Sequence, residues 1–146
     1  MAGEGIDLKL RLSLREGTVY YFIHHSVFSP EPHYFIVVNS DPLTQKLLLL
    51  AVVTSQVEKV KLRRKACPET LVALTPKDFD VLTKPSIVDC NDLKEVPLAE
   101  FNVRFAAYRI GYFDQDLPAV LRRALRKAIH ASIMVSDEQK ALVAKP

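Results

Sequence analysis

The sequence has few cysteines, few glycines and no long hydrophobic run. Its two cysteines, Cys67 and Cys90, are too few for a disulfide framework or a four-ligand zinc site. The longest apolar run, Leu47 to Val53, is far too short to span a bilayer. The first residues, Met1 to Gly5, contain no basic segment followed by an apolar one, so we expect no secretory signal. These absences argue against a membrane protein and a disulfide-rich secreted protein, and they predict a cytoplasmic location.

The remaining composition is typical of one globular domain. Apolar residues make up 49% of the 146 residues and charged residues 25%, a balance that excludes a disordered or fibrous chain. A chain of this size buries about 70% of its unfolded surface, so it needs neither a disulfide nor a metal ion to form a core. We therefore predict a single domain over residues 1–146.

The net charge of +3 conceals an uneven distribution. Residues 57–65 carry five basic and one acidic side chain, and residues 117–146 carry six basic and two acidic ones. The segment between them, residues 66–116, has five basic and nine acidic side chains. Two basic islands indicate a localised anionic partner, although two solvated surface faces would give the same pattern.

Apolar runs of two kinds predict a mainly β fold. Apolar and polar residues alternate over residues 6–14, which predicts a half-buried strand. Residues 34–38 and 47–54 are continuous apolar runs, which are typical of adjacent central strands that are covered on both faces. Further short strands are expected at residues 19–23, 57–62, 70–74 and 86–90.

Two segments carry signals for helices. Thr75-Pro76-Lys77-Asp78 has the hydroxyl, proline and acid of a helix start, so we expect a short helix to Leu82. Apolar residues recur at helical spacing over residues 117–132, and residues 136–146 form either a short helix or a loose tail. Residues 98–110 fit a helix or a strand equally well. The order of elements predicts an α+β protein, mainly β, with a small antiparallel barrel over residues 6–116, a short inserted helix and a C-terminal amphipathic helix.

Polar side chains at two predicted strand ends are the first candidates for chemistry. His24 and His25 follow one strand, His33 precedes the next, and Thr54 and Ser55 end a buried strand. Histidine titrates near neutral pH and can move a proton at the 2′-hydroxyl of RNA, while a hydroxyl or a cation stabilises the charge on phosphorus. The competing interpretation is that the hydroxyls cap a strand and the histidines are loop residues. The sequence contains no established metal or nucleotide-binding motif, so we expect no metal site and no cofactor.

A run of basic residues at alternate positions gives a second candidate. These residues are Lys59, Lys61, Arg63 and Lys65. On a strand they would share one face at intervals of about 6–7 Å, which suits the phosphates of a single-stranded nucleic acid. Nearby aromatic residues, Tyr20, Tyr21, Phe22 and Tyr34, would supply stacking surfaces for bases. The competing interpretation is an edge strand whose lysines prevent aggregation.

Five short segments between residues 17 and 130 carry a family resemblance. They are Gly17–Phe22, His33–Asp41, Val52–Ser55, Lys84–Asp89 and Ile110–Ile129. These segments resemble, in the same order, five parts of proteins of the MazF/PemK toxin family. The first two resemble the opening Gly-Asp-Val-aromatic strand and the second strand of that family. The last three resemble its Thr-Ser strand end, its Lys-x-Ser-Val-Val stretch and its Ile-Gly turn with the closing helix. The fold of that family is a small SH3-like barrel with helices, and the strand predicted at residues 6–14 lies upstream of its usual start.

This resemblance implies a metal-independent endoribonuclease toxin that cleaves single-stranded RNA, forms a homodimer and binds a cognate antitoxin. In the family an arginine before the second strand and the threonine of the Thr-Ser pair carry cleavage. Thr54 matches the threonine, whereas His33 stands at the arginine position. The implied catalytic residues are His33 as acid or base and Thr54 as stabiliser of the phosphoryl group. His33 opens one predicted strand and Thr54 closes another, so if these strands are antiparallel neighbours, we expect the two side chains to face one another across one pocket. The implied RNA-binding residues are His24, His25, Ser55, Lys59, Lys61, Arg63 and Lys65. The alternatives are a catalytically inactive SH3-like module that binds RNA or a protein, and an interaction protein that docks a partner through its terminal helix.

Overall fold

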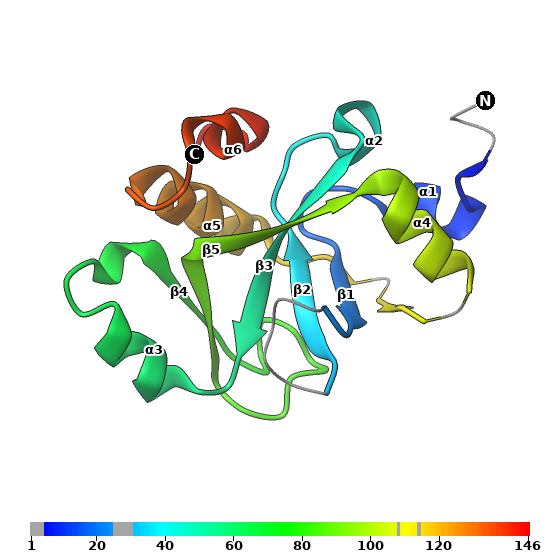
Figure 1. Ribbon diagram of the computed structural model, residues 1–146. Helices are drawn as coiled ribbons and strands as arrows, with labels where there is room; N and C mark the ends of the chain where they lie inside the picture. Colours follow the sequence, from blue (N-terminus) through cyan, green and yellow to red (C-terminus); the bar gives the residue numbers. More distant parts are fainter. Residues whose placement is uncertain (1–4, 25–30, 108, 114) are drawn as a thin grey trace.

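The computed structural model describes residues 5–24, 31–107, 109–113 and 115–146, and the core of this part is a six-stranded antiparallel sheet (Figure 1). The strands are β1 (Val19–Phe22), β2 (His33–Val37), β3 (Leu47–Thr54), β4 (Leu71–Leu74), β5 (Ser86–Pro97) and β6 (Gly111–Tyr112). Their order across the sheet is β4-β5-β3-β2-β1-β6. The two continuous apolar runs therefore form neighbouring central strands, which confirms that prediction and the α+β class.

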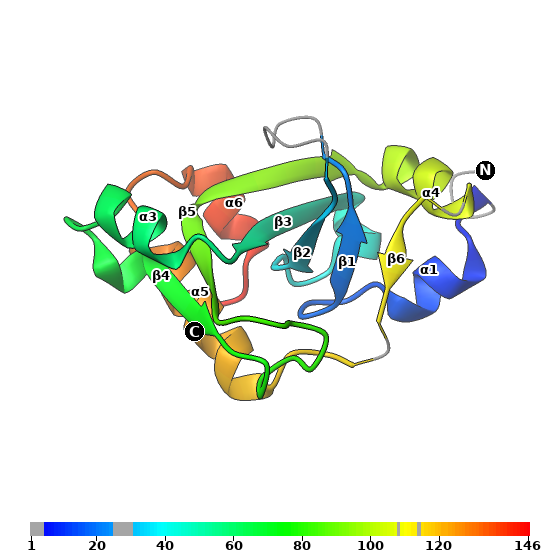
Figure 2. The ribbon, with the colours of Figure 1, turned by 90° about the horizontal axis from the view of Figure 1, so that it is seen from below.

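Both faces of the sheet are covered, because successive side chains of a strand point to opposite faces. Ile36 of β2 packs in a cluster with Leu125 and Ile129 of α5 (Ala119–Ala131). Its neighbour Phe35 packs in a second cluster, with residues of α1 (Leu8–Ser13) and α4 (Leu98–Ala106). Figures 1 and 2 show α5 on one side of the sheet and α1 with α4 on the other. This double cover explains why β2 and β3 have no polar face.

The longest strand, β5, carries an irregularity that matters for the site. Ala51 of β3 pairs with Leu93, whereas Val53 pairs with Val88, so additional β5 residues bulge out between these two pairs. One of them, Asp89, pairs instead with β4. Bulges bend a strand and redirect its side chains, and they are common beside functional sites.

The strand predicted at residues 6–14 is wrong, because this segment forms α1. Asp7 caps the helix by accepting hydrogen bonds from the backbone N–H groups of Lys9 and Leu10. Leu10 and Leu14, four residues apart, are buried, while the alternate leucines of the pattern, Leu8 and Leu12, are exposed. An alternating leucine pattern contains this helical spacing too, so the tertiary contacts decided between the two structures.

The strand predicted at residues 57–62 is also wrong, because α3 (Val57–Arg63) occupies that position. Glu58 lies in the first turn, and Lys61 and Arg63 lie in the last. This order of charges stabilises a helix through its dipole, and it is the signal that our sequence interpretation missed. On a helix, Lys59 and Lys61 project about 200° apart, so the predicted ladder on one face does not exist.

Three further segments settle the remaining expectations for secondary structure. Residues 75–82 form hydrogen-bonded turns instead of the predicted helix. Asp78 accepts a hydrogen bond from the backbone N–H of Thr75, as at a helix start, but the backbone bonds from Asp78 and Phe79 to Thr75 and from Leu82 to Phe79 do not continue into a helix. Residues 98–106 form α4, while α5 lies inside the predicted terminal helix and α6 (Asp137–Leu142) is the short helix of the two C-terminal alternatives. The short helices α2 (Pro42–Gln45) and η2 (Pro68–Thr70) complete the described elements. Within the described ranges, no helix combines the length and the hydropathy that crossing a bilayer requires.

Candidate functional site

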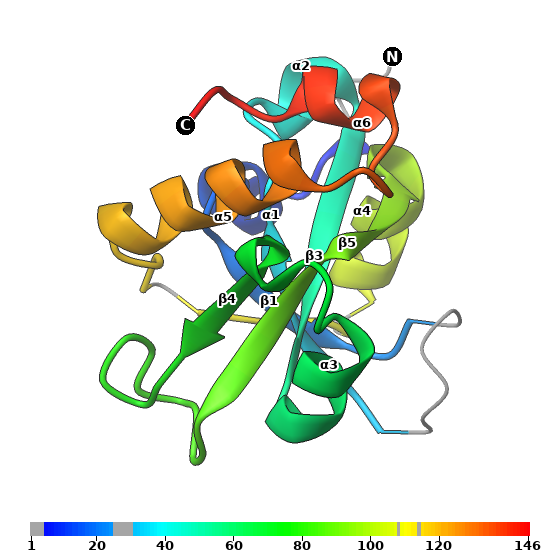
Figure 3. The same cartoon turned by 90° about the vertical axis from the view of Figure 1, so that its left-hand side faces the viewer.

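A cleft of about 830 Å³ opens where β2 begins and β3 ends. The three strands β1, β2 and β3 contribute to its lining, together with α3 and the segment 81–86 that leads into β5. Figure 3 shows α3 directly beyond the end of β3. Groups in this cleft that can move protons or hold phosphate include His33, Thr54, Ser55, Arg63 and Lys84, and the carboxylate of Glu31 also lines it.

His33 and Thr54 lie on neighbouring strand ends. Tyr34 of β2 pairs with Val53 of β3, so the antiparallel register places His33 opposite Thr54. Side chains of such directly opposed residues are on the same face, with their Cβ atoms about 4.5–5.5 Å apart. Both residues line the cleft, as the order of the strands predicts, while their chemical roles stay predictions.

A backbone carbonyl beside His33 determines which tautomer its neutral imidazole ring adopts. The Nδ1 atom lies 3.1 Å from the carbonyl oxygen of Glu31. A carbonyl oxygen only accepts hydrogen bonds, so Nδ1 carries the proton of the neutral ring, and Nε2 keeps its lone pair. His33 is half-buried, so this lone pair is available to a ligand in the cleft.

Thr54 is held by its own chain. Its Oγ1 atom accepts a hydrogen bond of 3.1 Å from the backbone N–H of Gln56. This is the strand-end cap that the competing interpretation of the sequence predicted. The cap uses one lone pair and leaves the hydroxyl hydrogen free to be donated, so capping and stabilisation of a phosphate are compatible.

Two cations reach the cleft from outside the sheet. Arg63 lies in the last turn of α3, and Lys84 lies in the segment before β5. Lys84 was not among the predicted site residues. Its position in the family-like segment Lys84–Asp89 was the signal that could have found it.

The other predicted RNA-binding residues have different positions. Ser55 lines the cleft. Lys59, Lys61 and Lys65 are exposed but are not among its lining residues. His24 is only 5% exposed and packs beside the rings of Phe22 and Phe35, with centroid distances of 6.3 and 6.0 Å. His25 lies outside the described residues.

Two tyrosines form an aromatic wall of the cleft. The rings of Tyr21 and Tyr34 lie 4.6 Å apart and are tilted by 44°. Burial, and secondarily the electrostatic effect of Tyr21, raises the pKa of Tyr34. The ring of Tyr34 also packs against the rings of Phe79 and Phe113. Of the four aromatic residues predicted to stack, Tyr20 and Phe22 are instead buried in the opposite core cluster.

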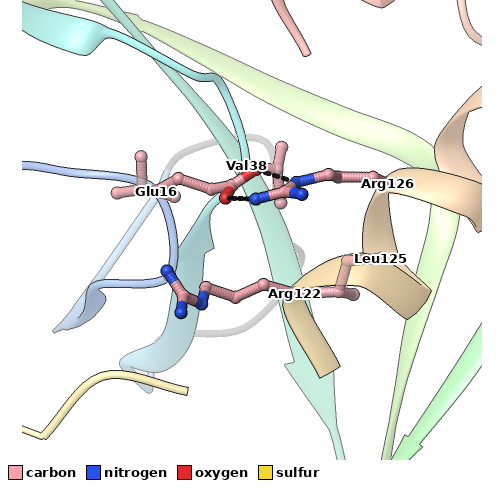
Figure 4. A pocket seen from close by; sticks show the side chains of 7 residues that line it. Glu16, Val38, Arg122, Leu125 and Arg126 are labelled. Carbon is pink, nitrogen blue, oxygen red and sulfur yellow. Dashed lines mark hydrogen bonds and ion pairs between the residues drawn. The ribbon is translucent and has the colours of Figure 1, made fainter. Parts of the chain in front are cut away.

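A second concavity, which we call the α5 junction, lies on another part of the sheet (Figure 4). It is lined by Glu16, Gly17, Val37, Val38, Arg122, Leu125 and Arg126. Arg126 forms a two-pronged ion pair with Glu16, and the hydrogen bonds that its guanidinium donates to this carboxylate raise the pKa of Arg126. The space left between these side chains is too narrow for a water molecule. The α5 junction is therefore a packed contact between α5 and the chain before β1, not a ligand site.

Metal ligands do not gather in the described part of the chain. Among residues 5–24, 31–107, 109–113 and 115–146, no three His, Cys, Asp or Glu side chains lie close enough to bind one ion. Cys90 is fully buried, and burial raises the pKa of its thiol to about 12, so this thiol is unreactive.

The strand order and the covering helices define a small α+β domain with a cleft at its central strand ends. No protein-family model and no curated protein matches the sequence. A solved structure described as an endoribonuclease in complex with its cognate antitoxin from Mycobacterial species is similar, with a TM-score of 0.53 and 14% identity over 84% of this chain and 97% of that chain. The Mycobacterium tuberculosis toxin MazF-mt6 gives a TM-score of 0.48 and 16% identity over 79% and 94% of the two chains. The first similarity shows that this chain shares the fold of that structure, in agreement with the predicted α+β class.

Proposed function

We propose that this protein is the toxin of a toxin–antitoxin pair and cleaves single-stranded RNA without a metal ion. The observation that carries the proposal is the pairing of His33 and Thr54 in one cleft with Arg63 and Lys84. RNA cleavage of this type needs a base for the 2′-hydroxyl and a donor for the charge that develops on the phosphate oxygens. These four side chains supply both groups.

The reaction is an internal transfer of the phosphate. The Nε2 atom of His33 takes the proton of the 2′-hydroxyl, and the 2′ oxygen attacks the adjacent phosphorus. The bond from phosphorus to the 5′ oxygen breaks, and this leaving oxygen takes up a proton from the imidazolium of His33 or from water. The products are a 2′,3′-cyclic phosphate and a 5′-hydroxyl. Thr54 donates its hydroxyl hydrogen to a phosphate oxygen, while the cations balance the charge of the phosphate.

The fold similarity supports the biological part of the proposal. The similar mycobacterial structure is an endoribonuclease in complex with its cognate antitoxin. By analogy we propose an antitoxin partner, a homodimer and action in the cytoplasm for this chain. Tyr21 and Tyr34 favour unpaired bases as ligands, because only a base outside a duplex exposes its face for stacking.

The test is cleavage of a single-stranded RNA by the purified protein in the presence of EDTA. We expect cleavage products ending in 2′,3′-cyclic phosphate, and we expect His33→Ala to lower the rate by about 10²–10⁴-fold, the usual contribution of a general acid–base group. Arg126→Met at the α5 junction is the matched control and should keep the wild-type rate. Cleavage that requires a divalent ion, or that survives His33→Ala unchanged, would refute the mechanism.

An inactive binding module is the second candidate, and His33 is the residue that favours it. At neutral pH an imidazole does not provide the fixed, two-pronged cation that the family arginine provides. In that case the wild-type protein would bind single-stranded RNA or a protein partner in the same cleft and leave the RNA intact. The EDTA assay and a binding assay on the same RNA separate the two functions.

A further inference from the structure

Asp89, in the bulge of β5, accepts hydrogen bonds from two consecutive arginines of the α3 region. Its Oδ2 atom lies 3.0 Å from Nε of Arg64 and 3.3 Å from Nη2 of Arg63. Its Oδ1 atom accepts hydrogen bonds from the backbone N–H and the side-chain amide of Asn91, at 3.1 and 2.8 Å. Burial alone would raise the pKa of Asp89, but the hydrogen bonds from Asn91 and Arg64 outweigh it and lower this pKa. Asp89 is therefore a carboxylate at neutral pH.

The support beneath Asp89 is itself fixed. The amide nitrogen of Asn91 donates to Oγ1 of Thr70 at 2.7 Å, and its oxygen accepts from Oγ of Ser132 at 2.6 Å. Asn91, Thr70 and Ser132 are all buried. A buried polar network in which each group has a partner holds its members in one arrangement. The carboxylate of Asp89 thus has a defined position relative to β4, η2 and the end of α5.

One carboxylate shared by two guanidinium groups leaves one positive charge in excess. The Arg64 side chain is 16% exposed and also contacts Sδ of Met134, so it is the partner that neutralises Asp89. The Arg63 side chain is 56% exposed and lines the cleft. Among the described residues, Asp89 is its hydrogen-bond acceptor, reached through Nη2 at 3.3 Å. The remaining donors of the planar Arg63 fork are therefore available to a ligand in the cleft.

We propose that Asp89 is a positioning residue, which fixes the guanidinium of Arg63 in the cleft so that Arg63 binds an RNA phosphate with a preset geometry. The inference rests on the proposed function, because it assumes that RNA is the ligand. Arg63 would then supply a guanidinium with a fixed orientation in a cleft where position 33 holds a histidine. A fork held in place loses little conformational freedom on binding, which is the advantage of arginine over a mobile lysine. The bulge of β5 provides this anchor, since it turns Asp89 out of the pairing with β3.

The test measures binding of a single-stranded 2′-O-methyl oligonucleotide, which has no free 2′-hydroxyl and cannot be cleaved. We expect Arg63→Gln to weaken binding by about tenfold, the usual effect of losing one charged hydrogen-bonding contact. Asp89→Asn should weaken binding by about three- to tenfold, although it removes a negative charge. A purely electrostatic effect would have the opposite sign, because fewer negative charges favour RNA.

Two comparisons separate positioning from general structural damage. In the Arg63→Gln background, Asp89→Asn should cause no further loss, because Asp89 then has nothing to position. Asp92→Asn is the matched control, since Asp92 lies on the same strand, pairs with Lys94 at the surface and carries the same charge. It should leave binding unchanged or slightly tighter. Equal weakening by Asp89→Asn with and without Arg63 would overturn the inference.

The outcome for cleavage is independent of this result. A wild-type protein that binds the oligonucleotide with Arg63 and Asp89 coupled, but cleaves no RNA, would refute the endoribonuclease and support the positioning role. A protein that cleaves RNA while Asp89→Asn binds as tightly as wild type would support the enzyme and refute the positioning role. Failure of the wild type to bind any single-stranded oligonucleotide would overturn both.

Discussion

The cleft and the α5 junction each pair a carboxylate with an arginine, but they differ in how open they are to solvent. The α5 junction also holds Arg122, whose Nε is buried and has no hydrogen-bond partner among the described residues. In the α5 junction, Arg126 and Glu16 form a one-to-one pair whose side chains are 27% and 13% exposed. In the cleft, Asp89 is shared by Arg63 and Arg64, and Arg63 is 56% exposed. The α5 junction leaves no room for water, whereas the group around Asp89 borders a cleft of about 830 Å³.

This difference separates a contact that stabilises the fold from one that is open to a ligand. The α5 junction leaves no room for a ligand beside its ion pair, so the contribution of this pair is to hold α5 against the chain before β1. A surplus guanidinium beside a cavity costs little stability, because it stays solvated until a ligand arrives. Substitutions in the cleft should therefore change activity more than stability, and substitutions in the α5 junction should do the reverse.

After His33→Ala, the largest effect is expected for Thr54→Val in the cleft. It removes the hydroxyl that we assign to charge stabilisation and should lower the cleavage rate by about 10²-fold. It also removes the cap on the Gln56 N–H, which costs about 1 kcal/mol and lowers the melting temperature by only a few degrees. Thr54→Ser keeps the hydroxyl and is the control. Cleavage kinetics with equal activity for Val and Ser would show that Thr54 is only a strand cap.

Gly17→Ala tests the α5 junction. Gly17 has a φ of +94°, and a Cβ atom there would lie 2.6 Å from Cδ of Arg122. We expect a loss of about 1–2 kcal/mol in the free energy of unfolding, measured by denaturant titration, because the conformation is strained for alanine and Arg122 must move. Cleavage below the melting temperature should be unchanged. Gly5→Ala, where nothing lies within 4 Å, should have no measurable effect on stability. Similar losses at both glycines would contradict this account.

Glu16→Gln should have a smaller effect of the same kind. It leaves the partly buried Arg126 without its carboxylate and should cost about 1 kcal/mol of unfolding free energy. Asp116→Asn breaks a more exposed pair with Arg15 and should cost less than about 0.5 kcal/mol. Thermal unfolding of both variants gives the comparison. Equal melting temperatures for the two variants would show that the ion pair of the α5 junction stabilises the protein no more than the exposed pair does.

The smallest effect is expected for Lys84→Ala in the cleft. Loss of one phosphate contact should reduce the dependence of log affinity on log salt concentration by about 0.7 for a single strand. Lys61→Ala on α3 removes the same charge away from the cleft lining and should change the slope less. Titrations of the oligonucleotide at several salt concentrations measure both slopes. Equal slopes would mean that the total charge, rather than the cleft, determines RNA binding.

Local patterns predicted the central strands, and also β1, β4 and the start of β5 within a residue or two, but not the segments at 6–14 and 57–62. The runs at 34–38 and 47–54 have no polar face, and only the middle of a sheet covers both faces of a strand. The alternating segments at 6–14 and 57–62 fit either a strand or one buried helical stripe, and both became helices. Their choice depended on partners distant in the sequence, such as Asn102, whose Oδ1 accepts a hydrogen bond from the backbone N–H of Asp7.

The sequence by itself determined the fold class, the central position of β2 and β3, and the meeting of His33 with Thr54, because the end of one antiparallel strand lies beside the start of its neighbour. It did not determine which cations join them. The expected ladder assumed a strand, whereas α3 brings only Arg63 to the cleft. The contact between Asp89 and Arg63 joins residues 26 positions apart through the β5 bulge. A bulge redirects side chains according to how strands pair across the whole sheet, so only the tertiary structure decided which charge of the chain remains open to a ligand.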